Sequence, residues 1–77
     1  MGTGQEAVFG LWCRLTGNDP LDFEVEEREA FLARPQVEEL ARTPYAVLLH
    51  AGTTVAKRES LPLERWLGAA RAVAQNA

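Results

Sequence analysis

The sequence predicts an all-α fold: a small bundle of four to five short helices that ends in an αα-hairpin. Apolar residues recur at the i, i+3, i+4 spacing of one helix face in several segments. Residues that begin and end helices, chiefly Thr, Asp, Gly and Pro, separate those segments. The chain has 77 residues, of which 47% are hydrophobic and 25% are charged. We therefore expect a single globular domain over residues 1–77.

The first helix is expected over residues 4–16. Thr3 and Glu6 have the spacing of a capping box, in which each side chain accepts a hydrogen bond from the backbone N–H of the other residue. Gly17 suits the position directly after a helix, where the backbone turns left-handed. Between these ends the apolar residues form one stripe at helical spacing, which contains Val8, Leu11, Trp12 and Leu15, with Phe9 and Cys13 to one side of it.

A second helix is expected over residues 20–33 and a third over residues 35–42. Asp19 and Pro20 are typical of a helix cap and of the first helical position. The residues that follow, up to Glu26, alternate in polarity as a short strand does. The strong helix formers after Glu26 nevertheless favour a helix, and no obvious partner strand exists.

The longest apolar pattern lies in the C-terminal half and predicts two helices over residues 44–74, joined by a tight turn. Thr43 and Pro44 suit a helix start, with the threonine hydroxyl as cap. The apolar residues keep helical spacing on both sides of the Ser60-Leu61-Pro62 turn. They are Tyr45, Leu48, Leu49, Gly52, Val55 and Ala56 on the first helix, and Leu63, Trp66, Leu67, Ala70 and Val73 on the second.

An α+β fold with a small hairpin at residues 45–58 is the alternative, because Gly52 weakens a helix and three β-branched residues follow it. The half-charged second strand that this alternative requires favours the helix instead. On a helix, Gly52 lies on the apolar stripe, where it would let a neighbouring helix approach closely. We then expect the first helix to pack into the groove of the hairpin, around one core that contains Trp12, Leu15, Leu48, Leu49, Trp66 and Leu67.

Few side chains could support catalysis or metal binding. His50 is the only histidine and Cys13 the only cysteine, so a zinc site would need carboxylates without any recognisable spacing. No calcium loop, P-loop or dinucleotide-binding motif is present. We therefore expect no enzyme activity, no catalytic residue, no metal and no cofactor. His50 is expected at a helix surface, and Cys13 is expected to pack.

Charge is unevenly distributed along the chain. Residues 1–42 carry nine acids and four arginines, a net charge of −5, whereas residues 43–77 carry four bases and two acids, a net charge of +2. Six of the acids fall within residues 19–29. A chain with this balance lacks the basic surface that direct binding to a nucleic acid requires.

The function predicted from these features is a non-catalytic protein-interaction module or small regulatory subunit. It would act through an apolar helix face and an acidic segment that attracts a basic protein partner. A homodimer is also considered, because a chain of this size is marginally stable alone. The alternative is an acidic inhibitor or antitoxin-like protein that occupies a nucleic-acid-binding site on a target enzyme. The candidate partner-binding residues are Asp22, Glu24, Glu26, Glu27 and, as an aromatic anchor, Trp66.

Composition also bears on location. The start of the sequence lacks the basic and apolar pattern of a signal peptide, and no run approaches the roughly 18 apolar residues that span a membrane. The single cysteine cannot form an internal disulfide. Seven arginines against one lysine are typical of a GC-rich genome. We expect a bacterial protein of the reducing cytoplasm.

Overall fold

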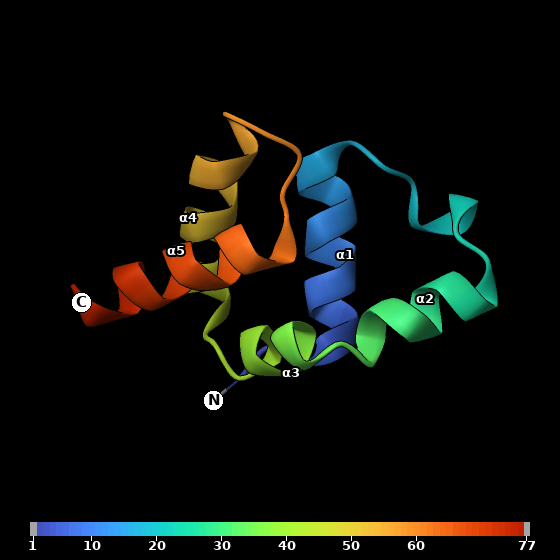
Figure 1. Cartoon of the computed structure of the whole chain (residues 1–77), viewed down its shortest axis with the longest axis horizontal. Coiled ribbons are helices and arrows are strands. Elements are labelled where there is room, and N and C mark those ends of the chain that lie inside the picture. The colour runs from blue at the N-terminus through green and yellow to red at the C-terminus, as the bar shows by residue number, and fades with distance from the viewer. Residues whose placement is uncertain (1, 77) are drawn as a thin grey trace.

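The computed structural model describes residues 2–76, and its regular elements are all helical (Figure 1). In chain order they are α1 (Gln5–Thr16), the short 3-10 helix η1 (Pro20–Asp22), α2 (Val25–Leu32), α3 (Pro35–Ala41), α4 (Tyr45–Ala56) and α5 (Leu63–Gln75). The predicted all-α class is confirmed. The alternative hairpin at residues 45–58 is wrong, because α4 runs unbroken through Gly52. Over this described part, no helix is both long and apolar enough to cross a membrane.

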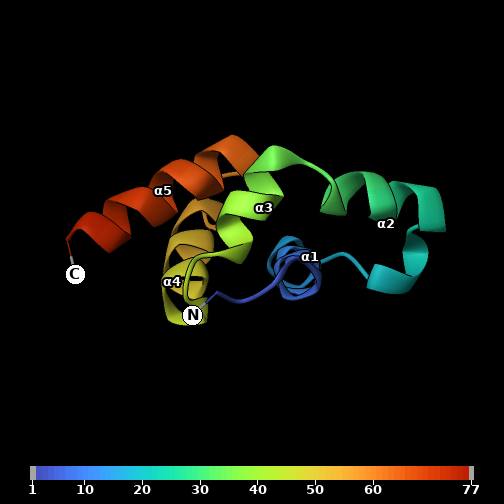
Figure 2. The ribbon, with the colours of Figure 1, turned by 90° about the horizontal axis from the view of Figure 1, so that it is seen from below.

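Helices α4 and α5 form the C-terminal hairpin, and α1 and α3 pack against it (Figure 1). Seen from below, α2 lies on the other side of α1, away from the hairpin (Figure 2). Neither η1 nor α2 contributes a buried residue. The main core therefore lies among the other four helices, and its buried residues are Val8, Leu11, Val37, Leu40, Leu48, Ala51, Leu61, Leu63, Trp66, Leu67 and Ala70.

The packing of α1 against the hairpin, predicted from the sequence, is confirmed at two contacts. The indole N–H of Trp12 donates a 2.9 Å hydrogen bond to the carbonyl of Leu61. The side chain of Leu15 lies against Gly52, so closely that a Cβ at Gly52 would come within 2.6 Å of the Leu15 Cδ1 atom. Gly52 thus gives α1 the close approach that its place on the apolar stripe predicted.

The expected core is correct except for Leu49. Its side chain is 39% exposed, because α4 presents the neighbouring positions Leu48 and Ala51 to the core. A helix rotates by about 100° per residue, so two adjacent leucines cannot both face inward equally. Among the other residues of the expected core, Leu48, Trp66 and Leu67 are buried, while Trp12 and Leu15 are partly buried against them.

Two predicted caps are wrong because tertiary contacts take the side chains elsewhere. The Thr3 hydroxyl donates to the carbonyl of Thr43 at 2.7 Å, and Gly4 occupies the cap position of α1. The backbone N–H groups of Thr3 and Gly4 both donate to the carbonyl of Ala41, so the N-terminal segment is held against the end of α3. The Thr43 hydroxyl donates to the carbonyl of Glu39 and does not cap α4.

The helix predicted over residues 20–33 is divided. Asp19 caps as predicted and accepts a 3.0 Å hydrogen bond from the N–H of Leu21, but it begins only the single turn η1. Phe23 is extended, at φ −96° and ψ 136°, in keeping with the alternating polarity of this stretch. Glu24 then caps α2, and its N–H donates to the carboxylate of Glu27 at 3.0 Å. α2 therefore begins at Val25.

Candidate functional site

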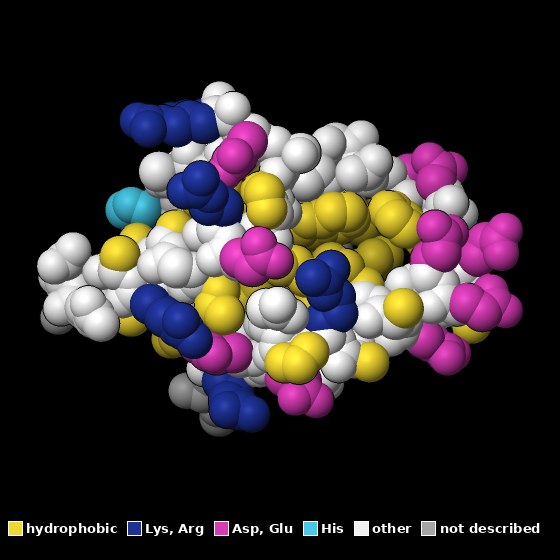
Figure 3. Space-filling model, viewed as in Figure 1, with side chains coloured by type: hydrophobic (Ala, Val, Ile, Leu, Met, Phe, Trp, Pro, Cys, Tyr) yellow, Lys and Arg dark blue, Asp and Glu magenta, His cyan; other side chains and the backbone are white. Residues whose placement is uncertain are grey.

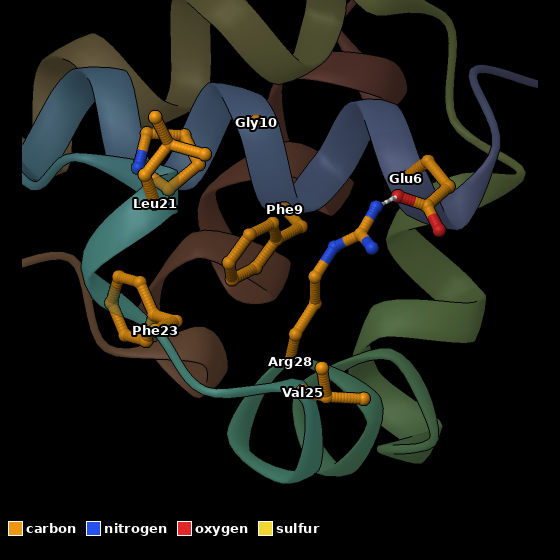
Figure 4. A pocket seen from close by; sticks show the side chains of 8 residues that line it. Glu6, Phe9, Gly10, Leu21, Phe23, Val25 and Arg28 are labelled. Atoms are coloured by element: carbon orange, nitrogen blue, oxygen red, sulfur yellow. Dashed lines mark hydrogen bonds and ion pairs between the residues drawn. The ribbon is translucent and has the colours of Figure 1, made fainter.

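A groove lies between α1 and the segment formed by η1 and α2. Its cavity volume is about 500 Å³. Figure 4 shows the rings of Phe9 and Phe23 in the groove, with Arg28 beside Phe9 and reaching toward Glu6. α1 supplies one wall, η1 and the start of α2 the other. The remaining lining residues are Gly10, Pro20, Leu21 and Val25.

The two most exposed large hydrophobic side chains of the described chain both line this groove. Leu21 is 89% exposed and Val25 is 68% exposed. Neither packs in the main core, so the fold does not explain why these positions are apolar. Apolar side chains gathered beside an open hollow are typical of a surface that binds another molecule.

Four aromatic rings form a second packing cluster at the edge of the main core, and two of them, Trp12 and Phe31, also pack against that core. Phe9 of α1 lies 5.4 Å from Phe23 and 5.1 Å from Phe31, measured between ring centroids. Trp12 lies 5.9 Å and 5.2 Å from the same two rings. The cluster attaches α2 and the residues before it to α1, since Phe31 of α2 and Phe23 after η1 both contact Phe9 and Trp12 of α1. It also lines a second hollow of about 260 Å³ that shares Phe9 and Phe23 with the groove.

Arg28 joins the two walls of the groove. Its guanidinium lies over the Phe9 ring, 5.8 Å from the centroid, a cation–π contact. The same guanidinium forms an ion pair with Glu6 of α1 (Figure 4). A further hydrogen bond, 3.1 Å from the Gln5 amide to the carbonyl of Leu32, holds the other end of α2. Polar contacts at the surface thus help to hold α2 on α1.

The acidic residues predicted to bind a partner are brought together at the outer end of the molecule. Asp22, Glu24, Glu26 and Glu27 are all exposed, and they lie on η1, at its junction with α2, and in the first turn of α2. Figure 3 shows acidic side chains gathered beyond the hollow in which hydrophobic side chains are visible. We call these four residues the acidic rim. Their placement beside the groove was not predicted from the sequence.

Trp66 does not belong to this surface. It is fully buried, and its indole N–H donates a 3.1 Å hydrogen bond to the carbonyl of Leu48. The prediction that Trp66 binds a partner is wrong, because an apolar helical stripe indicates burial without distinguishing a core from an interface. Its predicted packing in the core is confirmed.

His50 lies at a helix surface and Cys13 lies in the interior, as their positions in the sequence predicted. His50 is exposed on α4, and Cys13 is buried on α1. Burial raises the pKa of the Cys13 thiol, and the negative charge of Asp19 raises that pKa further. Across residues 2–76 no group of three or more His, Cys, Asp or Glu side chains is placed to hold a metal ion.

Sequence reasoning missed the residues that build the groove. Phe9 was seen only as lying beside the main stripe of α1, and Leu21 and Val25 fell within the single helix expected over residues 20–33. The useful signal was the alternation around Phe23, which marks the extended residue between η1 and α2. An apolar residue off the stripe, as Phe9 is, indicates a second packing surface on the same helix.

No protein-family model, no curated protein and no solved structure matches this chain. A function is therefore proposed from the groove, the aromatic cluster and the acidic rim.

Proposed function

We propose that the protein is a non-catalytic interaction module that binds a basic, amphipathic helix of a protein partner in the groove between α1 and α2. The observation that carries this proposal is the exposure of Leu21 and Val25, 89% and 68%, beside a groove that contains aromatic rings. Burying a side chain of this kind in an interface contributes roughly 1.5–3 kcal/mol. Two such side chains could anchor a partner of modest size.

A helix suits this groove better than a strand does. The described chain has no strand whose edge could pair with an extended peptide, so a partner must gain its affinity from side chains. Gly10 faces the groove from α1, and a Cβ built there meets nothing within 4 Å. The glycine is therefore not required by the packing of the fold, and it leaves room for the ridge of a partner helix.

The acidic rim supplies the preference for a basic partner. Residues 1–42 carry a net charge of −5, and the four exposed carboxylates of the rim lie on the segment of η1 and early α2 that also forms one wall of the groove. Charges placed at the edge of an interface raise the association rate more than they raise the affinity. Binding is therefore expected to be faster at low salt than at high salt.

The test uses a fluorescent amphipathic helical peptide built from leucine and lysine, followed by fluorescence anisotropy. The double substitution Leu21→Ser and Val25→Ser should weaken binding at least tenfold, about 1.4 kcal/mol for two buried side chains. The matched control is Tyr45→Ser and Leu49→Ser on α4, where two other large hydrophobic residues are exposed, 43% and 39%. Equal losses in the two double variants, or no loss in the first, would contradict the proposal.

An acidic inhibitor that occupies a nucleic-acid-binding site on an enzyme is the second candidate. The clustering of the four rim carboxylates at one end of the molecule favours it. In that case the partner would present its basic nucleic-acid site to the rim, and DNA or RNA would compete with the protein for the same target. Charge reversal at Glu24 and Glu26 would then abolish binding, whereas the apolar pair Leu21 and Val25 would matter less.

A further inference from the structure

The outer side of α4 is a second surface with exposed apolar side chains. Tyr45 and Leu49 lie one helical turn apart on it, and neither packs in the main core. His50 and Thr53 are exposed beside them. We call these four residues the α4 face. Residues 2–76 thus expose large hydrophobic side chains in two pairs, one in the groove and one on the α4 face.

Basic residues flank the α4 face at both ends. Arg42 precedes α4, and Lys57 and Arg58 follow its last turn. Residues 42–58 contain these three bases and no acid, a net charge of +3. Within residues 2–76 none of the three forms an ion pair, so the fold does not neutralise them. The chain therefore presents on its own surface a basic helix with an exposed apolar pair.

The groove carries the opposite charge. Residues 19–29 contain six acids and one arginine, a net charge of −5, and four of those acids form the acidic rim. In the part of the chain that the structure describes, no rim carboxylate forms an ion pair. The groove and the α4 face therefore match in both respects, because each joins an exposed apolar pair to unpaired charge and the two charges have opposite signs.

The two surfaces lie on different sides of the molecule. α1 packs against α4 and also against the segment of η1 and α2, and it lies between them (Figure 2). Figure 3 shows acidic side chains gathered at one end of the visible face, and most Lys and Arg side chains toward the other end. Because of this separation, α4 cannot reach the groove of its own copy.

We propose that the groove of one copy binds the α4 face of a second copy of this chain. This inference rests on the proposed function, and it names the partner that supplies the basic, amphipathic helix. The contact buries the apolar pair of the groove against the apolar pair of the α4 face. It also places the acidic rim beside the basic residues that flank α4.

A second copy has an advantage over a free peptide as the occupant of the groove. A disordered segment must become ordered when it binds, which costs part of the interaction free energy. α4 is already held as a helix by its packing against α5 and α1, so this cost does not arise. A chain of 77 residues also buries a small share of its surface alone, and the contact adds to that burial.

The contact joins two different surfaces, so it is heterologous and repeats head to tail. Each bound copy keeps a free groove or a free α4 face, to which the next copy adds. The average mass in solution should therefore rise with protein concentration. It should fall when salt is added, because the exposed charges on both surfaces are screened.

Two double variants test the arrangement. The groove variant carries Leu21→Ser and Val25→Ser, and the face variant carries Tyr45→Ser and Leu49→Ser. All four side chains are exposed, so the core stays intact. Sedimentation velocity, from about 10 µM to about 1 mM protein, should find each variant monomeric alone. An equal mixture should form a 1:1 pair and nothing larger, because only one intact groove and one intact face remain.

Other results of this experiment would overturn the proposal. Self-association of the groove variant alone would mean that α4 pairs with α4, and self-association of the face variant alone would mean that groove pairs with groove. A natural protein that stays monomeric at every concentration, or a mixture of the two variants that does so, would also contradict a groove that binds α4.

Charge reversal tests which parts of the two surfaces meet. Lys57→Glu and Arg58→Glu, added to the groove variant, should reduce its binding to the face variant at least tenfold. Asp22→Lys and Glu26→Lys, added to the face variant, should restore it. These two acids do not take part in the cap of α2. Pairing that is equally strong with and without the reversed charges would overturn the placement of the rim beside α4.

The leucine and lysine peptide separates failure of this inference from failure of the proposed function. The face variant has an intact groove, so it should bind the peptide as the natural protein does, and the peptide should dissociate the mixed pair. Peptide binding without any pairing of the two variants would keep the proposed function and overturn the second copy as partner. Absence of both would overturn both proposals.

Discussion

The indole N–H of Trp66 donates a 3.1 Å hydrogen bond to the carbonyl of Leu48, inside the hairpin of α4 and α5. The contact depends on Gly52, one turn further along α4, because a Cβ there would lie 3.0 Å from the indole nitrogen. It would also lie 2.6 Å from the Cδ1 atom of Leu15. The position where three helices meet therefore requires a residue without a side chain.

Substitution of Gly52 by alanine is expected to destabilise the fold by about 1–3 kcal/mol, because the added methyl overpacks a site that α1 and α5 already fill. The measurement is urea unfolding followed by circular dichroism. Gly68→Ala on α5 is the matched control, since a Cβ there meets nothing within 4 Å, and it should stabilise by up to about 1 kcal/mol. Equal effects of the two substitutions would contradict this account of Gly52.

Leu48 and Leu49 are neighbours with different environments. Leu48 is fully buried, whereas Leu49 is 39% exposed. Leu48→Ala should cost about 2–5 kcal/mol in the free energy of unfolding, enough to unfold much of a domain this small. Leu49→Ala should cost well under about 1 kcal/mol. Thermal melts of the two variants give the comparison, and similar melting temperatures would show that α4 presents a different face to the core.

Arg28 is expected to stabilise α2 against local unfolding from the surface of α1. Arg28→Gln removes the ion pair with Glu6 and the stacking on Phe9, and leaves α2 attached mainly through the half-buried ring of Phe31. Hydrogen exchange measured by mass spectrometry should become faster in residues 19–33 and stay unchanged in α4 and α5. Arg71→Gln, at an exposed ion pair between α3 and α5, is the control. Faster exchange throughout the chain in the Arg28 variant would mean that α2 belongs to the main cooperative unit.

The features of this fold that could be predicted from the sequence are those that a single helix determines. Helical spacing of the apolar residues was sufficient to predict the all-α class. It also predicted the burial of Leu48 and Trp66, because residues at that spacing share one helix face and that apolar face turns toward the core. The role of Gly52 was also predicted, since a glycine on an apolar stripe indicates a close neighbour. These features depend on one helix at a time.

The candidate site depends on contacts between segments that no local pattern contains. Thr3 has the sequence of a capping residue, yet it donates to Thr43, forty positions away. Phe9 and Phe23 meet because the chain turns at η1, and the pairing of Arg28 with Glu6 follows from that turn. Acidic residues next to one another in sequence were visible, but their position beside an apolar groove was not.

The ion pair of Glu39 and Arg71 predicts a dependence of stability on pH. Two hydrogen bonds of 2.8 Å and 2.7 Å from the Arg71 guanidinium lower the pKa of the Glu39 carboxyl below its ordinary value. A group with a lowered folded-state pKa stabilises the fold above its unfolded pKa, about 4.3, and loses that contribution as the pH falls through the folded value. The difference in stability between the natural protein and Glu39→Gln should therefore be largest near neutral pH and shrink below about pH 4.

That difference should also shrink when salt is added at neutral pH, because both side chains are largely exposed and their attraction is screened. Urea unfolding at several pH values, at low and high salt, gives both comparisons. A difference that grew as the pH fell would have the wrong sign for a carboxylate stabilised in its charged form.

Substitutions of Gly10 are expected to have opposite effects on the stability of the fold and on peptide binding in the groove. A Cβ at this position of α1 meets nothing within 4 Å, so Gly10→Ala should raise the free energy of unfolding by up to about 1 kcal/mol. The same methyl projects into the groove and should weaken binding of the leucine and lysine peptide, and Gly10→Leu should weaken it further. Gly68→Ala, also in open space but on α5, should stabilise without changing peptide affinity. If Gly10→Leu bound the peptide as tightly as the natural protein does, the partner would have to lie elsewhere, because a leucine cannot fit between α1 and a helix seated in the groove.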